Sequence, residues 1–362
     1  MIRAIAASIL LLVSAPAMAL EDADYTAAVA ATAKSAIIPG YQAFGETAKE
    51  MQTQLDALCK APGDETLKNA QQQFAALATA WARIQYISFG PIFEHQRAFR
   101  IEYWPDKRNV VGRQLAEVLK KQERAALEPE RFATTTVGVQ GLPVLERLLF
   151  DDDALVALAS GDGDFRCGLF AAISNNLETI ARDVVTGWTE GDNAFLARIE
   201  HPSEGDEELP SGRDAAGRLL NDLLTATIAM RDMKLLAPLG KSLERAKGQG
   251  AEYWRSGQSI AVLAANLEGW RALFGTDQGL GGLLAAQPDG KKVADDVAAT
   301  ADQAAKALAQ ITLPLDKAVA DAEQRKQVEA FAAQLIKLRD LLAGPVTTTL
   351  NIPVGFNALD GD

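Results

Sequence analysis

The stretch YQAFGETAKEMQTQLDAL, residues 41–58, carries its apolar side chains three or four positions apart. This spacing places them on one face of a helix and predicts an amphipathic α-helix. In the next stretch Asp64 is a candidate N-cap, and apolar residues follow at the same spacing from Leu67 to Ile84. We expect this second helix to end at Phe89-Gly90-Pro91, because glycine and proline interrupt helices.

The rest of the chain has the same helical character. Alanine is abundant and aromatic residues make up only 6% of the chain, which favours helix over strand. An irregular stretch follows from Gly90. Further helices are then expected at 109–123, from Leu142 onward, and at 165–188, 214–236, 241–249, 256–274, 291–311 and 315–342. The sequence therefore predicts an all-α fold.

The segment EHPSEGDEELPSGRD, residues 200–214, combines acidic residues with proline, serine and glycine, a composition typical of linkers. We therefore expect two helical-bundle halves, 20–200 and 214–362, joined by an acidic linker at 201–213. A threonine triplet occurs in each half, at 134–136 and 347–349. This repetition suggests a duplication and a pseudo-two-fold relation between the halves.

The N-terminus has the features of a secretory signal peptide. Arg3 precedes an apolar run, and Ala17-Met18-Ala19 has the form of a cleavage site, so residues 1–19 are expected to be removed. No cysteine follows the cleavage site, which argues against a lipid anchor. Apolar stretches in the remaining chain are too short for a membrane helix. We expect a periplasmic protein without a transmembrane segment.

The net charge indicates which classes of partner the protein binds, and the cysteines indicate whether it contains a disulfide. The net charge of −12 disfavours nucleic acid and favours cations or cationic partners. Cys59 and Cys167 are the two cysteines, and a disulfide between them is expected in an oxidising compartment, with free buried thiols as the alternative. Closing a loop of about 100 residues would stabilise the fold by roughly 4 kcal/mol.

The usual catalytic signatures are missing from the sequence. It contains no HExxH zinc motif, no GxSxG nucleophile elbow and no P-loop. The two histidines are His95 and His201, which do not stand at a metal-ligand spacing. His201 precedes a proline in the acidic linker, so we expect it in solvent. His95 lies near Glu94 and Glu102, and it is either a surface histidine or a metal ligand.

The segment GLPVLE, residues 141–146, resembles the GxHxxE signature of the imelysin family, with Pro143 in the place of the histidine. Further stretches extend the resemblance over most of the chain: WARIQYISFGPI (81–92), YWP (103–105), RCGLFAAISNNLETIARDVVTGW (166–188), YWRSGQSIAVLAANLEGWRALFG (253–275) and GFNALDGD (355–362). The resemblance implies two helical halves with the signature facing a cleft near their junction. It also implies a link to bacterial iron acquisition, and a peptidase label inherited from a founding member.

Pro143 decides how this resemblance is interpreted. A proline in a peptide bond has no lone pair to offer a metal, but it is well suited to the start of a helix. Glu146 would then lie at the end of the first helical turn, where the helix dipole lowers a carboxyl pKa. Glu146 alone is a poor zinc site, although with other oxygens it could hold iron or another divalent or trivalent cation. Alternatively Glu146 is structural and pairs with Arg83, Arg97 or Arg100.

Other residues are candidates for the same cleft. Arg83 follows Trp81, and Arg255 and Ser256 follow Trp254, so each half holds a tryptophan-arginine cluster that either packs helices or binds a ligand. The full set expected at the cleft is Gly141, Pro143, Glu146, Arg83, Trp254, Arg255, Ser256, Asn357 and Asp360. Glu146 and His95 are the candidate metal ligands.

These features support a non-catalytic periplasmic protein that serves iron acquisition. It would bind iron, an iron complex or a membrane component of iron uptake through the cleft near Glu146. The alternatives are a divergent metallopeptidase and a structural helical domain without a ligand. The missing histidine favours binding over catalysis, because a zinc site that loses one of three protein ligands binds zinc weakly.

Overall fold

The computed structural model describes residues 20–275 and 277–353. Every regular element within these ranges is helical, so the predicted all-α fold is confirmed. The expected signal peptide, and Asn357 and Asp360, lie outside the described residues.

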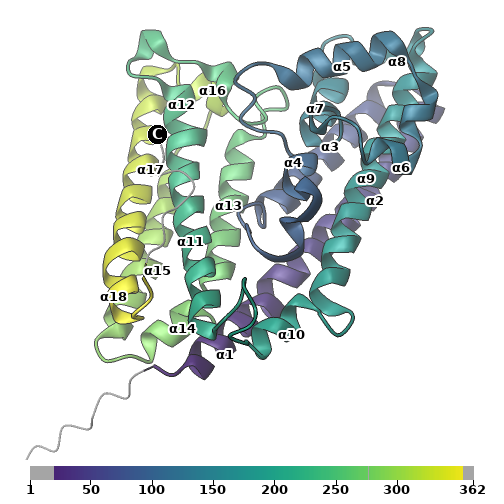
Figure 1. Cartoon of the computed structure of the whole chain (residues 1–362). Coiled ribbons are helices and arrows are strands. Elements are labelled where there is room, and N and C mark those ends of the chain that lie inside the picture. Colours follow the sequence, from purple (N-terminus) through teal and green to yellow (C-terminus); the bar gives the residue numbers. More distant parts are fainter. Residues whose placement is uncertain (1–19, 276, 354–362) are drawn as a thin grey trace, which may run out of the picture.

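The elements up to residue 200 form the part of the molecule drawn from purple to teal in Figure 1. They are α1 (Asp22–Thr32), the π-helical turn η1 (Ala33–Ile37), α2 (Ile38–Lys60), α3 (Asp64–Ala82), α4 (Arg97–Ile101), α5 (Val110–Lys121), α6 (Pro129–Phe132), α7 (Leu142–Phe150), α8 (Ala154–Ala159), α9 (Gly163–Thr189) and α10 (Phe195–Glu200).

The elements after residue 200 stand beside them, from green to yellow in Figure 1. They are α11 (Gly212–Ile228), the π-helical segment η6 (Ala229–Leu236), α12 (Ala237–Leu239), α13 (Ser259–Phe274), α14 (Leu280–Ala285), α15 (Gly290–Leu308), α16 (Leu315–Ala318), α17 (Ala322–Leu341), the π-helical turn η9 (Leu342–Val346) and α18 (Thr347–Thr349).

The amphipathic pattern of residues 41–58 positions the first part of the molecule. Tyr41, Phe44 and Met51 are fully buried on one face of α2, which packs along both α3 and α9. Cys59, near the end of α2, forms a disulfide with Cys167 in the second turn of α9. The two longest helices of this part are therefore joined covalently at one end.

Contacts between the two parts of the chain hold them together. α1 packs against α11 and α14, and the Asp22 carboxylate accepts hydrogen bonds from the backbone N–H groups of Gly212 (2.8 Å) and Arg213 (2.9 Å) at the start of α11. α13 packs against α3, and one buried apolar cluster includes side chains from both parts. The division at 201–213, and a pseudo-two-fold relation between the halves, stay predictions.

The structure differs from three of the predicted helices: one ends earlier, one does not form and one is interrupted. α3 ends at Ala82, not near Phe89, because α13 meets it there: Asn266 donates its side-chain N–H to the Ala82 carbonyl at 2.6 Å. Residues 241–249 contain only short 3₁₀ turns, after Gly240 at φ 65°. The stretch 315–342 is interrupted at Asp321, whose side chain caps the start of α17.

The sequence analysis predicted that the chain has no transmembrane segment, and the helices of the structure can be compared with this prediction. Among the described residues, no helix combines the length and the apolar character that crossing a bilayer requires.

Candidate functional site

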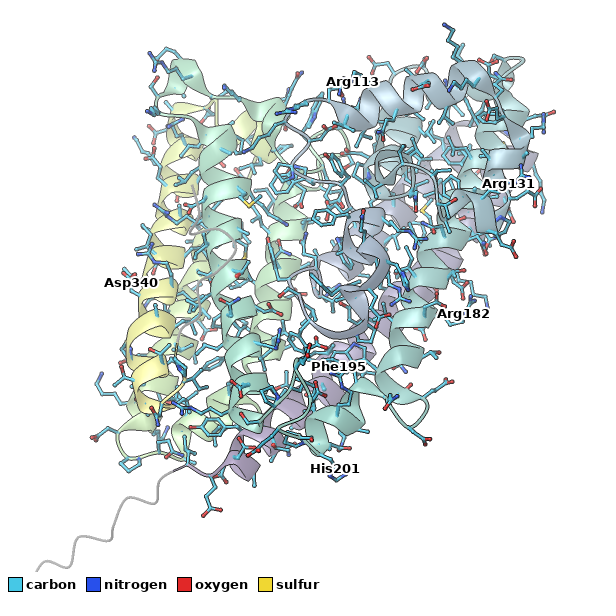
Figure 2. The ribbon with its side chains drawn as sticks, in the orientation of Figure 1. Arg113, Arg131, Arg182, Phe195, His201 and Asp340 are labelled. Carbon is cyan, nitrogen blue, oxygen red and sulfur yellow. A yellow bond between two sulfur atoms is a disulfide. The ribbon has the colours of Figure 1, made fainter. Side chains whose placement is uncertain are left out.

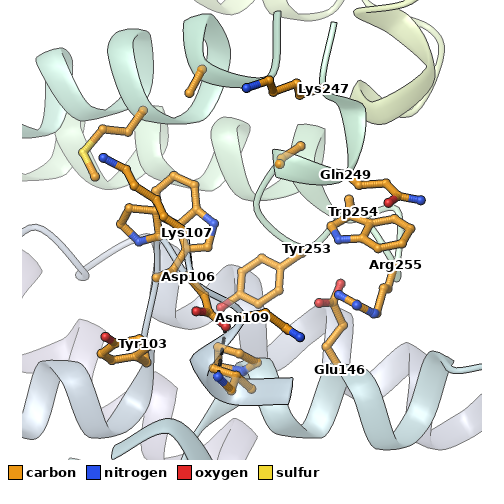
Figure 3. A pocket seen from close by; sticks show the side chains of 18 of the residues that line it. Tyr103, Asp106, Lys107, Asn109, Glu146, Lys247, Gln249, Tyr253, Trp254 and Arg255 are labelled. Carbon is orange, nitrogen blue, oxygen red and sulfur yellow. Dashed lines mark hydrogen bonds between the residues drawn. The ribbon is translucent and has the colours of Figure 1, made fainter. Parts of the chain in front are cut away.

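A cleft of about 740 Å³ opens where the two parts of the chain meet. Three segments line it: 103–111 before α5 and in its first turn, 143–147 on α7, and parts of 232–255 around η6 and the turns that follow. Figure 3 shows the labelled side chains of these segments around the opening, with Glu146 and Arg255 on one side and Lys247 across from them. The sequence resemblance implied a cleft of this kind.

Glu146 lies at the edge of this cleft and is buried, with 5% of its surface exposed. Its Oε1 accepts hydrogen bonds from the backbone N–H of Ser256 (3.0 Å) and from the Ser256 hydroxyl (2.8 Å). Ser256 was expected at the cleft, and it comes from the other part of the chain. Glu146 therefore ties α7 to the segment that precedes α13.

The expected lowering of the Glu146 pKa is wrong. Burial raises the pKa, and the opposing hydrogen bonds from Ser256 and the positive charges of Arg255 and Arg147 do not overcome it. Glu146 is the fifth residue of α7 and so lies beyond the first turn, where the influence of the helix dipole fades. Desolvation favours the protonated form of a carboxyl group, and here it is the largest effect.

Gly141 and Pro143 set the start of α7. Gly141 precedes the helix, and a Cβ there would lie 2.1 Å from the Ile101 carbonyl oxygen, so only glycine permits this approach. Pro143 is the second helical residue and lines the cleft. Together they place α7 against the segment before residue 102 and turn Glu146 toward Ser256.

The arginines proposed as partners of Glu146 bind elsewhere. Arg83 pairs with Glu268 (2.9 Å), and Arg97 pairs with Glu94 (3.0 Å). Arg100 donates to the side chains of Gln140 and Asn176. The interpretation of Glu146 as an ion-pair partner of Arg83, Arg97 or Arg100 is therefore wrong, and Arg83 is not among the described residues that line the cleft.

Two other arginines surround Glu146. Arg147 follows it on α7, and its guanidinium donates a hydrogen bond to the Asn109 side chain at 2.6 Å. Arg255 lies over the Trp254 ring, 4.5 Å from its centroid, and its Nε is 3.3 Å from an oxygen of Asp151. Burial, and next the positive charge of Arg255, lower the pKa of Arg147.

The two histidines lie away from this arrangement. His95 is exposed on a short 3₁₀ turn, in the left-handed region at φ 53°. His201 is exposed just after α10, at the lower edge of the molecule in Figure 2. Within 20–275 and 277–353, no three His, Cys, Asp or Glu side chains come together as a metal-binding group. His95 is not among the described residues that line the cleft beside Glu146, so the two candidate metal ligands are not brought together there.

Directly beneath the cleft lies a buried charged network that was not predicted from the sequence. Lys234, on η6, is 2% exposed, and its Nζ lies 2.7 Å from a carboxylate oxygen of Glu252. The same ammonium group donates hydrogen bonds to Gln85 (2.8 Å) and Asn266 (2.7 Å). It thus joins α13, the end of α3 and the segment before Trp254.

Glu102 is the second buried carboxyl group of this network. Its Oε2 accepts hydrogen bonds from Trp81 Nε1 (2.8 Å) and Gln85 Nε2 (3.1 Å). Burial, assisted by the nearby charge of Glu252, raises the pKa of Glu102 to about 8 against the opposing effect of Lys234. Glu102 is therefore largely protonated at neutral pH.

Several polar atoms of the network lack a hydrogen-bond partner among the described residues. They are both carboxylate oxygens of Glu252 and the hydroxyl group of Tyr86. Glu102 Oε1 and the Tyr253 hydroxyl make no hydrogen bond of good geometry, but these two side chains are close enough for Tyr253 to lower the pKa of Glu102. The 2.7 Å contact of Lys234 with Glu252 is an ion pair whose direction is poor for a hydrogen bond. Buried polar groups without partners are uncommon and mark regions under functional or structural constraint.

A sequence signal for this network does exist. Glu-Tyr-Trp occurs twice, at 102–104 and at 252–254, once in each part of the chain. In both copies the glutamate is buried, while the tyrosine and tryptophan line the cleft. The two copies therefore form both the lining of the cleft and the charged layer beneath it.

The chain resembles known proteins in sequence and in fold. The family model described as imelysin, a peptidase family, matches residues 37–342. None of the curated proteins compared with the chain matches it significantly.

Two solved structures resemble the chain over nearly its whole length. An imelysin-like protein from Psychrobacter arcticum 273-4 is 25% identical, with a TM-score of 0.75, over 94% of this chain and 99% of the other. A candidate iron-regulated protein A precursor from Parabacteroides distasonis ATCC 8503 is 14% identical, with a TM-score of 0.76, over 92% and 96%. The second likeness concerns the fold alone.

Proposed function

The chain belongs to the imelysin family, and from this premise we propose that it is a non-catalytic binding protein of bacterial iron acquisition that uses the cleft beside Glu146. The observation that carries the proposal is the chemistry of the signature segment. Pro143 replaces the imidazole of the family signature, and the Glu146 carboxylate is occupied by Ser256. Neither residue is arranged to hold a catalytic zinc ion and its water.

Export to the periplasm is part of the same proposal. Residues 1–19 have the composition of a signal peptide, and the disulfide between Cys59 and Cys167 suits an oxidising compartment. The Parabacteroides distasonis protein, which shares the fold, is named an iron-regulated protein A precursor.

A cleft-filling variant tests the proposal in cells. Ala237 is exposed and lines the cleft, so Ala237→Trp should obstruct it without a change in charge. Ala43→Trp, on the exposed face of α2, is the matched control. In a strain that lacks the gene, the wild-type protein and the control should restore growth on limiting iron, whereas Ala237→Trp should not. Equal growth of the deleted and parent strains would contradict a role in iron acquisition.

Metal analysis and a protease assay test the metallopeptidase alternative. The protein purified from periplasm should contain no stoichiometric zinc and should not cleave casein. Stoichiometric zinc together with casein cleavage, both lost in Glu146→Gln, would instead establish a peptidase. The conservative substitution keeps an oxygen that can accept the hydrogen bonds of Ser256, so the fold should be retained.

A further inference from the structure

We propose that the cleft recognises iron as an anionic, oxygen-rich chelate rather than as a bare cation. This inference rests on the proposed function and specifies the chemical class of its ligand. It reverses the expectation from the net charge of −12, because the charges that line the cleft differ from those of the whole chain.

Basic groups are concentrated in the cleft. Its lining includes four cationic side chains, from Lys107, Arg147, Lys247 and Arg255. Two of them come from the part of the chain before residue 201 and two from the part after it, so a ligand in the cleft would meet positive charge from both sides. Figure 3 shows Lys247 across the opening from Arg255.

The acidic groups of the lining are already engaged. Both carboxylate oxygens of Asp106 accept hydrogen bonds from backbone N–H groups at the start of α5, at 2.6 and 3.0 Å. Asp232 pairs with Arg231, and Glu146 accepts two hydrogen bonds from Ser256. The lining thus holds four basic against three acidic side chains, and each of the three acids has a partner of its own.

Arg147 and Arg255 each have one polar partner, Asn109 and Asp151, and each guanidinium group retains further N–H donors for a ligand. Both guanidinium groups line the cleft on the Glu146 side, so an anion bound there would be attracted by two positive charges. Arginine binds carboxylate groups through two parallel hydrogen bonds, and Trp254 holds the Arg255 guanidinium by stacking. Tyr103 and Trp104 add aromatic surface for the organic part of a chelate.

The size of the cleft also favours a small-molecule ligand over a single ion. A volume of about 740 Å³ is that of a small-molecule site, many times larger than a single ion needs. No group of three or more His, Cys, Asp or Glu side chains lies among the described residues, and the proposal therefore takes the oxygen donors of the iron from the chelate. A chelate with several carboxylate groups meets this requirement and complements the arginines.

Isothermal titration calorimetry tests the proposal with variants that remove either a positive or a negative charge from the cleft. The probes are ferric citrate, citrate alone, and ferrous sulfate without a chelator under anaerobic conditions. Arg147→Gln and Arg255→Gln should each weaken ferric citrate binding on the order of tenfold. Glu146→Gln should leave the affinity unchanged or raise it, because it removes a negative charge. Arg182→Gln, an exposed arginine on α9 paired with Glu178, is the matched control and should have no effect.

Thermal melting first verifies that the variants are folded. The binding results are then interpreted as follows. Ferric citrate binding that is lost in both cleft arginine variants supports the proposal. If free citrate binds as tightly as ferric citrate, the cleft is an anion site, but the proposal that it recognises an iron chelate is wrong. Binding of ferrous ion alone that is lost in Glu146→Gln would overturn the inference and leave the proposed iron function intact. Absence of binding by all probes, together with normal growth of Ala237→Trp on limiting iron, would overturn both.

Discussion

Glu146 and Lys234 illustrate how burial governs single side chains in this protein. Glu146 has two hydrogen bonds and two nearby guanidinium groups, and its pKa is nevertheless raised. Lys234 is almost completely enclosed, and its ammonium group has two hydrogen-bond acceptors and one ion-pair partner. A buried charge of this kind is tolerated only while its partners remain, so removing one partner costs far more than losing an ion pair at the surface.

Lys234→Met should lower the free energy of unfolding by about 3–5 kcal/mol, because it leaves the Glu252 carboxylate buried without its cation. Urea denaturation followed by circular dichroism measures the change. Lys292→Met is the control: this lysine pairs with Asp296 at the surface, and its loss should leave the free energy of unfolding nearly unchanged. Lys234→Met combined with Glu252→Gln should recover part of the stability. Equal stability of the two single variants would refute the interpretation.

At the scale of elements, the long helices could be predicted and the network between them could not. The faces of α2 and α9 were evident because residues such as Phe44 and Ile173 recur with helical spacing, and both are buried. The end of α3 depends on Asn266, which lies far away in the sequence. Ser256 was expected at the cleft, but its hydrogen bonds to Glu146 and the burial of Lys234 arise only when distant segments meet.

The approach of α7 to residue 101 can be tested at Gly141. Gly141→Ala places a methyl group against the Ile101 carbonyl oxygen and should reduce stability by about 1–3 kcal/mol. Gly161→Ala is a suitable control, since a Cβ there meets no atom within 4 Å. Thermal melting of both variants should show a clear shift for Gly141→Ala alone. A melting temperature of Gly141→Ala equal to that of the control would mean that α7 does not approach so closely.

The disulfide between α2 and α9 should stabilise the fold chiefly by restricting the unfolded chain. Replacing both cysteines with serine should lower the free energy of unfolding by about 2–4 kcal/mol, given a sequence separation of 108 residues. Melting the wild type with and without dithiothreitol, beside the double variant, measures this effect. If the reductant leaves the wild-type melting temperature unchanged, the bond either does not form or contributes nothing.

For the whole molecule, buried acids determine how stability depends on pH. Burial raises the pKa of Glu102 to about 8 and that of Asp222 to about 7, and it also raises the pKa of Glu146. Unfolded carboxyl groups titrate near pH 4. Between pH 4 and pH 8 the folded state therefore holds protons that the unfolded state has released, so its stability falls as the pH rises.

We expect the wild-type protein to be more stable at pH 6 than at pH 8, by about 1–3 kcal/mol. Urea denaturation across pH 5.5–8.5 measures this slope. Glu102→Gln and Asp222→Asn should each flatten it, because neither amide titrates. The trend should reverse in stronger acid, where Asp206, whose pKa the Arg198 guanidinium lowers, takes up its proton. Greater wild-type stability at pH 8 than at pH 6 would show that these carboxyl groups are not desolvated.

The aromatic lining of the cleft gives this protein an internal optical reporter. Of its five tryptophans, Trp81, Trp188 and Trp270 are at most 3% exposed, whereas Trp104 and Trp254 are partly exposed beside the opening. Occupancy of the cleft would alter the indole emission of these last two and leave the other three as a constant background. A coloured or paramagnetic guest would quench that emission, so occupancy could be followed in unlabelled protein in real time.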